Sequence, residues 1–292
     1  MASDSLHSFL APQRTVLGRL FAALLIALAT IDARAATAAV KVPFFMFTTS
    51  QFPTADEATK VSAVLRRHAT SDDYLGINVV MQFPDLASRM SNAHLYTLPP
   101  SLAEVERAAM GKCGAGAGLI IYDGEHWSAT PPNEQADMVT AIARGNTIVH
   151  QTGCQDYGIA PDGQYIGIAQ GTCRHDPAAS IHRGIDWTGI TLFDIQAQRL
   201  LGSICTKRAG VDTYVGAVRS IAADVRARSS IPKIVAQLSF RLTPPDRMIP
   251  AIRQLSGITD GFYIAYPRNV GTACSYCSPA NLDQVLQAIH HQ

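Results

Sequence analysis

The segment 118–127 combines an apolar run with side chains that can transfer protons or stack on a sugar. Its sequence is GLIIYDGEHW, so the apolar part ends in two carboxylates, an imidazole and an indole. Successive side chains of a strand face opposite sides, so Asp123 and Glu125 share one side, about 6.6 Å apart along the backbone. Two carboxylates in one partly dry space can divide acid and base roles, because their mutual repulsion keeps one protonated. We therefore expect acid/base chemistry here.

We expect different roles for the two carboxylates. Glu125 lies further along the chain and has the longer side chain, so we assign it as the proton donor. Asp123 would orient Glu125 or stabilise positive charge, and Trp127 would stack on a sugar ring. The structural alternative is that Asp123 or Glu125 caps the following loop, or that the pair belongs to an ion network.

A second polar cluster follows the strand expected over 189–195. Asp194, Gln196 and Gln198 lie at alternate positions and therefore share one face. Asp194 would act as the carboxylate opposing Glu125, and the glutamines would bind substrate hydroxyl or amide groups. The alternative is a buried polar plug, whose members would need hydrogen-bond partners.

Apolar strand-like runs alternate with helical stretches along the chain, which predicts βα units around a parallel sheet. Pro131, Asp212, Pro244 and Ser278 mark helix starts, and Thr54 and Ser101 begin capping boxes. Gly111, Gly145 and Gly257 are expected to follow helix C-termini. Seven strands are expected, over 42–48, 76–83, 117–122, 157–161, 189–195, 233–240 and 261–266, and an eighth over 164–169.

These elements predict a single (β/α)8 TIM barrel over residues 36–292, with one strand irregular or missing. A doubly wound open sheet is the alternative, but the first strand has no glycine-rich phosphate loop after it, so we expect no nucleotide cofactor. In a barrel the C-terminal strand ends form the active face, which adds Asp162 and Tyr263 to the expected substrate-binding residues. Asp162 also lies in an ordinary turn sequence, Ala-Pro-Asp-Gly.

The Asp-x-Glu pair resembles the catalytic strand of chitinase-like glycoside hydrolases, whose pattern is Asp-x-x-Asp-x-Asp-x-Glu. Asp123 matches its last Asp and Glu125 its acid, whereas Ile121 and Gly118 stand where the first two Asp would be. The resemblance covers about ten residues and implies a barrel that cleaves a carbohydrate or related polymer. The surrounding segment, with the later Cys-x-x-Cys, also resembles secreted bacterial proteins of unassigned role.

Two other short motifs suggest different chemistry. His182-Arg183-Gly184 resembles the tripeptide of glycerophosphodiester phosphodiesterases, also barrels, but it precedes a strand instead of following the first one. A phosphodiesterase-type barrel is therefore a lesser alternative. His126 beside two carboxylates could bind a metal ion, but no His-x-x-x-His spacing accompanies it, so we predict no metal site.

Residues 1–35 have the pattern of a signal peptide. Two arginines precede the apolar run 20–31, which is shorter than the roughly 20 residues that span a bilayer, and Ala-Arg-Ala follows. We therefore expect a secreted or periplasmic protein without a stable membrane span; an uncleaved anchor is the alternative. Six cysteines suit an oxidising compartment, and proximity favours the pairs Cys154–Cys173, Cys274–Cys277 and Cys113–Cys205.

The remaining chain is formally neutral, with 21 basic and 21 acidic side chains, and it has no Lys/Arg block, so we expect no nucleic-acid partner. The sequence does not define the oligomeric state. The combined hypothesis is a secreted glycoside hydrolase-like enzyme with Glu125, Asp123 and Asp194 in catalysis. Its main alternative is a non-catalytic barrel that binds carbohydrate or protein, because fold alone does not determine function.

Overall fold

The computed structural model divides the chain into two units, Met1–Lys41 and Val42–Gln292. The first unit, with the signal-peptide prediction, lies outside the described residues, so that prediction stays untested. The structure describes residues 42–49, 52, 54–88, 94–110, 117–153, 155–169, 171–266 and 274–291.

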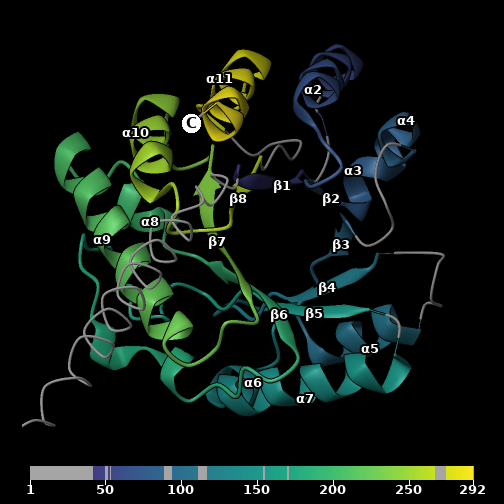
Figure 1. Ribbon diagram of the computed structural model, residues 1–292, viewed down its shortest axis with the longest axis vertical. Coiled ribbons are helices and arrows are strands. Elements are labelled where there is room, and N and C mark those ends of the chain that lie inside the picture. The colour runs from purple at the N-terminus through teal and green to yellow at the C-terminus, as the bar shows by residue number, and fades with distance from the viewer. Residues whose placement is uncertain are drawn as a thin grey trace, which may run out of the picture. The chain divides into compact units, whose positions relative to one another are not determined.

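The second unit is a closed barrel of eight parallel strands in sequence order, with β8 pairing back onto β1. The single (β/α)8 TIM barrel predicted from the sequence is therefore confirmed. Figure 1 shows the helices arranged around the outside of these strands. The strands are β1 (Phe44–Thr48), β2 (Tyr74–Gly76), β3 (Leu95–Thr97), β4 (Leu119–Tyr122), β5 (Asp156–Ile159), β6 (Ile190–Ile195), β7 (Lys233–Ser239) and β8 (Gly261–Ala265).

Helices fill the connections between most strands. The exception is the connection from β5 to β6, whose described residues contain only the 3₁₀ helices η2 (Pro177–Ala179) and η3 (Ile181–Arg183). The α-helices are α2 (Ala55–His68), α3 (Ile77–Gln82), α4 (Pro84–Ala87), α5 (Leu102–Met110), α6 (Pro132–Ala136), α7 (Met138–Thr152), α8 (Gln198–Leu201), α9 (Lys207–Arg226), α10 (Pro245–Leu255) and α11 (Pro279–His290).

Strand alternation divides the core into two layers. On β4, Leu119 and Ile121 pack with a cluster inside the barrel, whereas Ile120 and Tyr122 pack with the cluster that includes the helices. The same alternation puts Leu192 of β6 inside and Phe193 outside. Residues that continue the inner row past the strand ends therefore reach the mouth of the barrel.

The strand expected over 76–83 is wrong for most of its length. The strand ends at Gly76, and residues 77–82 form α3. Val79, Val80 and Phe83 are buried while Met81 is exposed, and this spacing fits one face of a helix. The run of apolar, β-branched residues predicted a strand because it is too short for its periodicity to distinguish a helix from a strand.

The eighth strand is β3 and not the expected segment 164–169. Residues 164–167 form turns, and Gly167 has a φ of +82°, a conformation that an extended strand cannot contain. β3 has only three residues, too few for an alternating pattern to stand out in the sequence. The prediction allowed for one irregular or missing strand, and β3 is that strand: it is present but short.

The helix-start predictions are mostly confirmed. The side chains of Thr54, Ser101 and Ser278 accept hydrogen bonds from backbone N–H groups three residues later. The start expected at Asp212 is wrong, because α9 begins five residues earlier behind its cap Thr206. The prediction for Gly111 lies outside the described residues, whereas Gly257 does adopt a left-handed φ of +73° after α10.

The cysteine pairing is partly corrected. Cys274–Cys277 is a disulfide, as expected, and Cys173 pairs with Cys205. The second bond excludes both Cys154–Cys173 and Cys113–Cys205; Cys113 and Cys154 themselves lie outside the described residues. Proximity along the chain failed because the loops after β5 and β6 meet at the barrel mouth. Two disulfides are compatible with an extracellular protein.

In the part of the chain that the structure describes, none of the helices combines the length and the apolar character needed to traverse a lipid bilayer.

The prediction that Gly145 follows the end of a helix is wrong, because Gly145 lies inside α7. A Cβ atom there would collide with Oη of Tyr157, a buried side chain of β5 that donates a hydrogen bond to the carbonyl of Ile142. The missing side chain therefore lets α7 approach the barrel closely.

We predict that Gly145→Ala destabilises the protein although alanine favours helices. The methyl group must displace Tyr157, and overpacking of this kind costs about 1–3 kcal/mol. The matched control is Gly216→Ala in α9, where a Cβ meets nothing within 4 Å and should stabilise by roughly 0.5–1 kcal/mol. Urea unfolding measures both; equal effects of the two substitutions would contradict the packing argument.

Candidate active site

The two carboxylates of segment 118–127 lie just past the end of β4, at the barrel mouth. Leu119 and Ile121 face the barrel interior, and Asp123 continues their row. The backbone N–H of Asp123 donates to the carbonyl of Pro99 (2.9 Å), and that of Glu125 to Oγ1 of Thr130 (3.1 Å). The loop that carries both acids is thus tied to the chain that follows β3.

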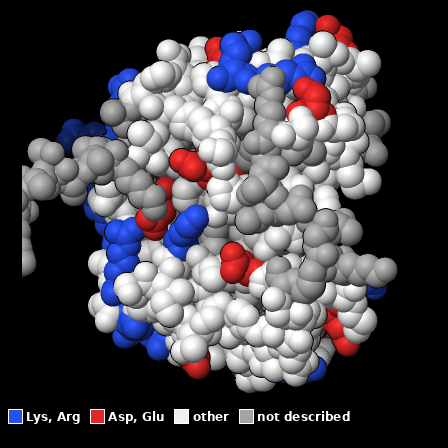
Figure 2. Space-filling view, turned by 45° about the vertical axis from the view of Figure 1, so that its right-hand side comes forward, with Lys and Arg blue, Asp and Glu red and all other residues white. Residues whose placement is uncertain are grey.

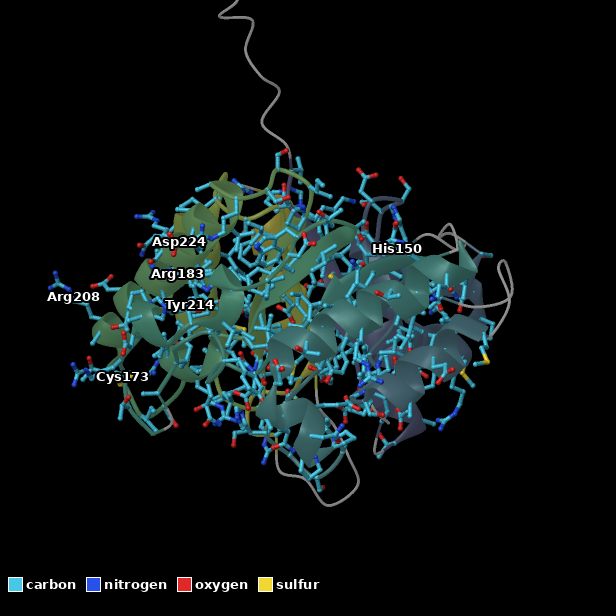
Figure 3. The ribbon with its side chains drawn as sticks, turned by 90° about the horizontal axis from the view of Figure 1, so that it is seen from below. His150, Cys173, Arg183, Arg208, Tyr214 and Asp224 are labelled. Carbon is cyan, nitrogen blue, oxygen red and sulfur yellow. A yellow bond between two sulfur atoms is a disulfide. The ribbon has the colours of Figure 1, made fainter. Side chains whose placement is uncertain are left out.

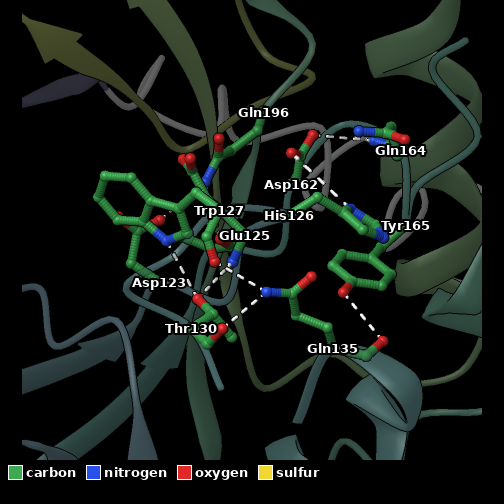
Figure 4. A network of polar contacts seen from close by, with 11 residues as sticks. Asp123, Glu125, His126, Trp127, Thr130, Gln135, Asp162, Gln164, Tyr165 and Gln196 are labelled. Carbon is green, nitrogen blue, oxygen red and sulfur yellow. Dashed lines mark hydrogen bonds and ion pairs between the residues drawn. The ribbon is translucent and has the colours of Figure 1, made fainter. Parts of the chain in front are cut away.

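Thr130 is the centre of this loop (Figure 4). It is fully buried, and its Oγ1 also accepts a hydrogen bond from Nε1 of Trp127 (3.0 Å) and donates one to the carbonyl of Pro100 (2.9 Å). Nε2 of Gln135 donates to the carbonyls of Trp127 and Thr130 (2.8 and 2.6 Å). The sequence did not reveal Thr130, because a single threonine in a loop carries no pattern.

Asp162 follows β5 and lies next to the same loop. Its backbone N–H donates to the carbonyl of Gly124 (3.0 Å), and its Oδ1 accepts from the N–H of Gln164 (3.1 Å). Its Oδ2 is 3.9 Å from Nδ1 of His126, whose ring stacks on Tyr165 with 4.1 Å between centroids. Asp162 is therefore both a turn residue and a buried negative charge beside the acids.

Gln196, the first residue after β6, connects the ends of β4 and β5. Its Nε2 donates to Oδ1 of Asp123 (2.9 Å) and to the carbonyl of Ala160 after β5 (2.7 Å). Figure 4 shows Gln196 above Asp123 and Glu125. This contact agrees with the prediction that the polar residues after β4 and β6 lie close together. Gln196 was expected to bind substrate, but its side-chain amide is already hydrogen-bonded to Asp123.

Asp194 lies deeper than expected from its place on β6. Its side chain is 1% exposed, and its Oδ1 has no hydrogen-bond partner among the described residues. Burial raises its pKa well above the ordinary value, and the charges of Asp123 and Glu125 raise it further. Tyr263, which was expected to bind substrate, is also buried, with its ring against Tyr96 at 6.1 Å between centroids.

The pKa values of both candidate acids are raised. For Asp123 the main cause is burial, followed by the charge of Glu125, while the hydrogen bond from Gln196 acts in the opposite direction. For Glu125 the causes are burial and then the charge of Asp162, opposed by Gln196 and by the positive charge of Arg199. Both groups therefore hold protons to higher pH than exposed carboxyl groups do.

A cavity of about 550 Å³ opens beside this network. Figure 2 shows acidic and basic side chains close together near the middle of the face it presents. The expected residues Glu125, Gln196 and Gln198 line the cavity, together with Arg199, Ser239 and Arg241, which the sequence reading missed.

The other expected residues do not line this cavity. Asp123 is hydrogen-bonded to Gln196, Asp162 is hydrogen-bonded to the loop after β4, and Trp127 is 46% exposed on that loop. Asp194 and Tyr263 are buried inside the barrel. Arg199 and Arg241 could have been proposed from their places just after the strands at 189–195 and 233–240, but isolated arginines at such places are common.

The tripeptide His182-Arg183-Gly184 does not form part of the barrel mouth. His182 is buried in η3, and its Nε2 lies 3.2 Å from Oδ2 of Asp224 on α9, which Arg183 also binds. Figure 3 shows Arg183 and Asp224 together on the outside of the molecule. Burial lowers the pKa of His182. These contacts give the motif a structural role and remove the support for a phosphodiesterase-type site.

Among the described residues, no three His, Cys, Asp or Glu side chains are arranged to hold a metal ion.

No family model and no curated protein matches the chain. Solved structures that are similar to the chain at a low level include the following two. One is a designed cube-shaped, porous protein cage built by fusing symmetric oligomeric domains (TM-score 0.44, 12% identity, covering 86% of this chain and 73% of that one). The other is assigned as a deoxyribose-phosphate aldolase from Toxoplasma gondii (TM-score 0.45, 13% identity, 87% and 93%). Neither likeness bears on activity.

We predict that Asp194→Asn stabilises the protein at pH 8. A carboxyl group whose pKa is raised by folding contributes most stability when protonated, and this contribution is lost as pH rises through the folded-state pKa. Asparagine avoids the buried charge, so Tm should rise by a few degrees, since about 1 kcal/mol shifts it by roughly 2–4 °C in a domain of this size.

The difference in Tm between Asp194→Asn and the wild type should shrink as pH falls towards 4, and calorimetry at several pH values measures it. Asp72→Asn, at an exposed position, controls for the change in net charge. A lower Tm for Asp194→Asn at pH 8 would show that the carboxylate is compensated by a partner.

Proposed function

We propose that this protein hydrolyses a glycosidic bond in a carbohydrate or related polar polymer, with Glu125 as the proton donor. The observation that carries the proposal is that Glu125 combines exposure to a cavity with a raised pKa. A glycosidase needs a carboxylic acid that is still protonated at the working pH to protonate the leaving oxygen. Burial and the charge of Asp162 supply that condition.

Asp123 supports Glu125 in this proposal. It keeps some exposed surface, accepts the hydrogen bond from Gln196 and lies two residues before the donor on the same loop. Its negative charge, when present, would stabilise the positive charge that develops on the sugar ring in the transition state. The same charge raises the pKa of the buried Asp194 below it.

The cavity lining suits a polar substrate. Oε1 of Gln198 is buried and has no hydrogen-bond partner among the described residues, so a sugar hydroxyl would satisfy it. Ser239 offers a hydroxyl at the end of β7. Trp127, two residues after Glu125, presents an exposed indole that is held by Thr130. Aromatic surfaces of this kind stack on the apolar faces of sugars.

A non-catalytic barrel that binds carbohydrate or protein is the second candidate. The observation favouring it is the depth of Asp194: Glu125 is the only carboxylate among the described residues that line this cavity. A hydrolase with Asp194 as the opposing carboxylate would need that side chain to reach the cavity. Asp123 does not line the cavity either, so it would act through its closeness to Glu125 on the same loop.

We also propose that the protein is located outside the cytoplasm. The predicted signal peptide and the two disulfides of the described chain support secretion or a periplasmic location.

We predict that Glu125→Gln lowers kcat/KM for sugar release by about 10²–10⁴-fold, the usual contribution of a general acid, while substrate binding persists. The amide keeps the shape of the side chain but cannot give up a proton in the same way. Release of reducing ends from a panel of polysaccharides measures the activity, and calorimetry measures binding. Glu106→Gln on α5 is the matched control on the surface. Equal activity of wild type and Glu125→Gln would refute the assignment, and binding without hydrolysis would favour the second candidate.

We predict that Asp162→Asn moves the alkaline limb of the activity profile to lower pH. A general acid is lost as pH rises through its pKa, and removing the charge of Asp162 lowers the pKa of Glu125. Asparagine retains the oxygen that caps the Gln164 N–H, so the turn should survive. A plot of the logarithm of kcat/KM against pH measures this shift. An alkaline limb at the same or a higher pH would contradict the effect of the Asp162 charge on the pKa of Glu125.

A further inference from the structure

Two exposed arginines line the cavity. Arg199 lies in α8 after β6, and Arg241 lies two residues past the end of β7. Neither guanidinium makes a hydrogen bond or ion pair within the described chain. By contrast, Arg66, Arg183 and Arg226 each lie within 3.2 Å of a carboxylate.

The charge of the cavity lining is positive when Glu125 carries its proton. Arg199, Arg241 and Glu125 are the charged residues among those that line it. A protonated glutamic acid is neutral, so two positive charges remain. Such a lining attracts anions, and the attraction is stronger in a concave site than on an open surface.

The end of α8, the helix that contains Arg199, and the loop that follows it are fixed in place. Nη1 of Arg247 on α10 donates hydrogen bonds to the carbonyls of Leu201, Gly202 and Cys205. The Cys173–Cys205 disulfide joins the end of this loop to the loop after β5, and Gly171 and Ser203 from the two loops both line the cavity. A preformed wall reduces the ordering cost of binding.

We propose that the cavity binds an anionic saccharide, whose carboxylate or sulfate group is held by Arg199 and Arg241. This proposal rests on the proposed function for the saccharide part and adds the charge of the substrate. A guanidinium matches the geometry of both oxyanions, because its N–H groups donate in pairs to two oxygens. The two arginines come from neighbouring strands, β6 and β7, whereas Glu125 comes from β4. The anionic group and the scissile bond would therefore occupy different parts of the cavity.

The test is calorimetric binding of matched oligosaccharides to the full-length protein. The probes are oligogalacturonate and oligoalginate, their carboxyl-reduced neutral forms, and a sulfated oligosaccharide from carrageenan. We expect at least one anionic probe to bind at least about tenfold more tightly than its neutral form, with affinity that falls as salt is raised. The carboxylated and sulfated arms distinguish the two sources of negative charge.

The variants are Arg199→Gln, Arg241→Gln and the double substitution, with Arg253→Gln on the outer helix α10 as the matched control. Each cavity variant should lose about tenfold or more in affinity for the anionic probe and none for its neutral form. Arg199→Lys and Arg241→Lys should recover part of it. Circular dichroism and the affinity for neutral probes check folding.

The outcomes separate this inference from the proposed hydrolysis. Anionic probes that bind through the arginines but release no sugar would support the inference and refute hydrolysis. Glu125-dependent cleavage of neutral polymers, with no preference for anionic ones, would overturn the inference and leave hydrolysis standing. The inference is also overturned if no anionic probe binds, or if the double arginine variant binds as well as the wild type.

Discussion

Repulsion between carboxylates in the mouth of a closed barrel is the constraint on which this site depends. Asp123, Glu125, Asp162 and Asp194 come from β4, β5 and β6, and parallel strand ends in a barrel must meet. Burial makes the charges of Asp123, Glu125 and Asp194 costly, and the neighbouring charges add to that cost. These three groups therefore cannot all be ionised cheaply, and a proton held by one of them is the natural result.

The surrounding contacts act on both of the acids after β4. The hydrogen bonds from Gln196 lower the pKa of Asp123 and of Glu125, while burial and the charge of Asp162 raise the pKa of both. Thr130 and Gln135 hold the loop that carries the acids, which keeps their separation from changing freely. Asp194 shows the cost of the arrangement, because Oδ1 of this buried carboxylate has no hydrogen-bond partner among the described residues, which lowers stability at neutral pH.

Sequence reasoning reached the architecture and the inner row because both depend on local periodicity. Leu119 and Ile121 define which side of β4 faces inward, and Asp123 follows from them; capping residues such as Thr54 mark helix starts through one local hydrogen bond. The same reasoning failed where three-dimensional contacts decide. The three residues of β3 carry no periodicity, the Cys173–Cys205 bond depends on two loops meeting, and the depth of Asp194 depends on how far the barrel layers extend.

The arginines and the acid are coupled through charge. Arg199 lowers the pKa of Glu125, so an anion that neutralises Arg199 removes that influence and strengthens the hold of Glu125 on its proton. Coupling of this kind is reciprocal, and a protonated Glu125 in turn repels the bound anion less than a charged one. Under the proposed function, an anionic substrate would thus help to keep Glu125 protonated for the cleavage step. A neutral substrate would bind next to an acid that loses its proton at lower pH, so charge on the substrate would affect both recognition and the pH range of catalysis.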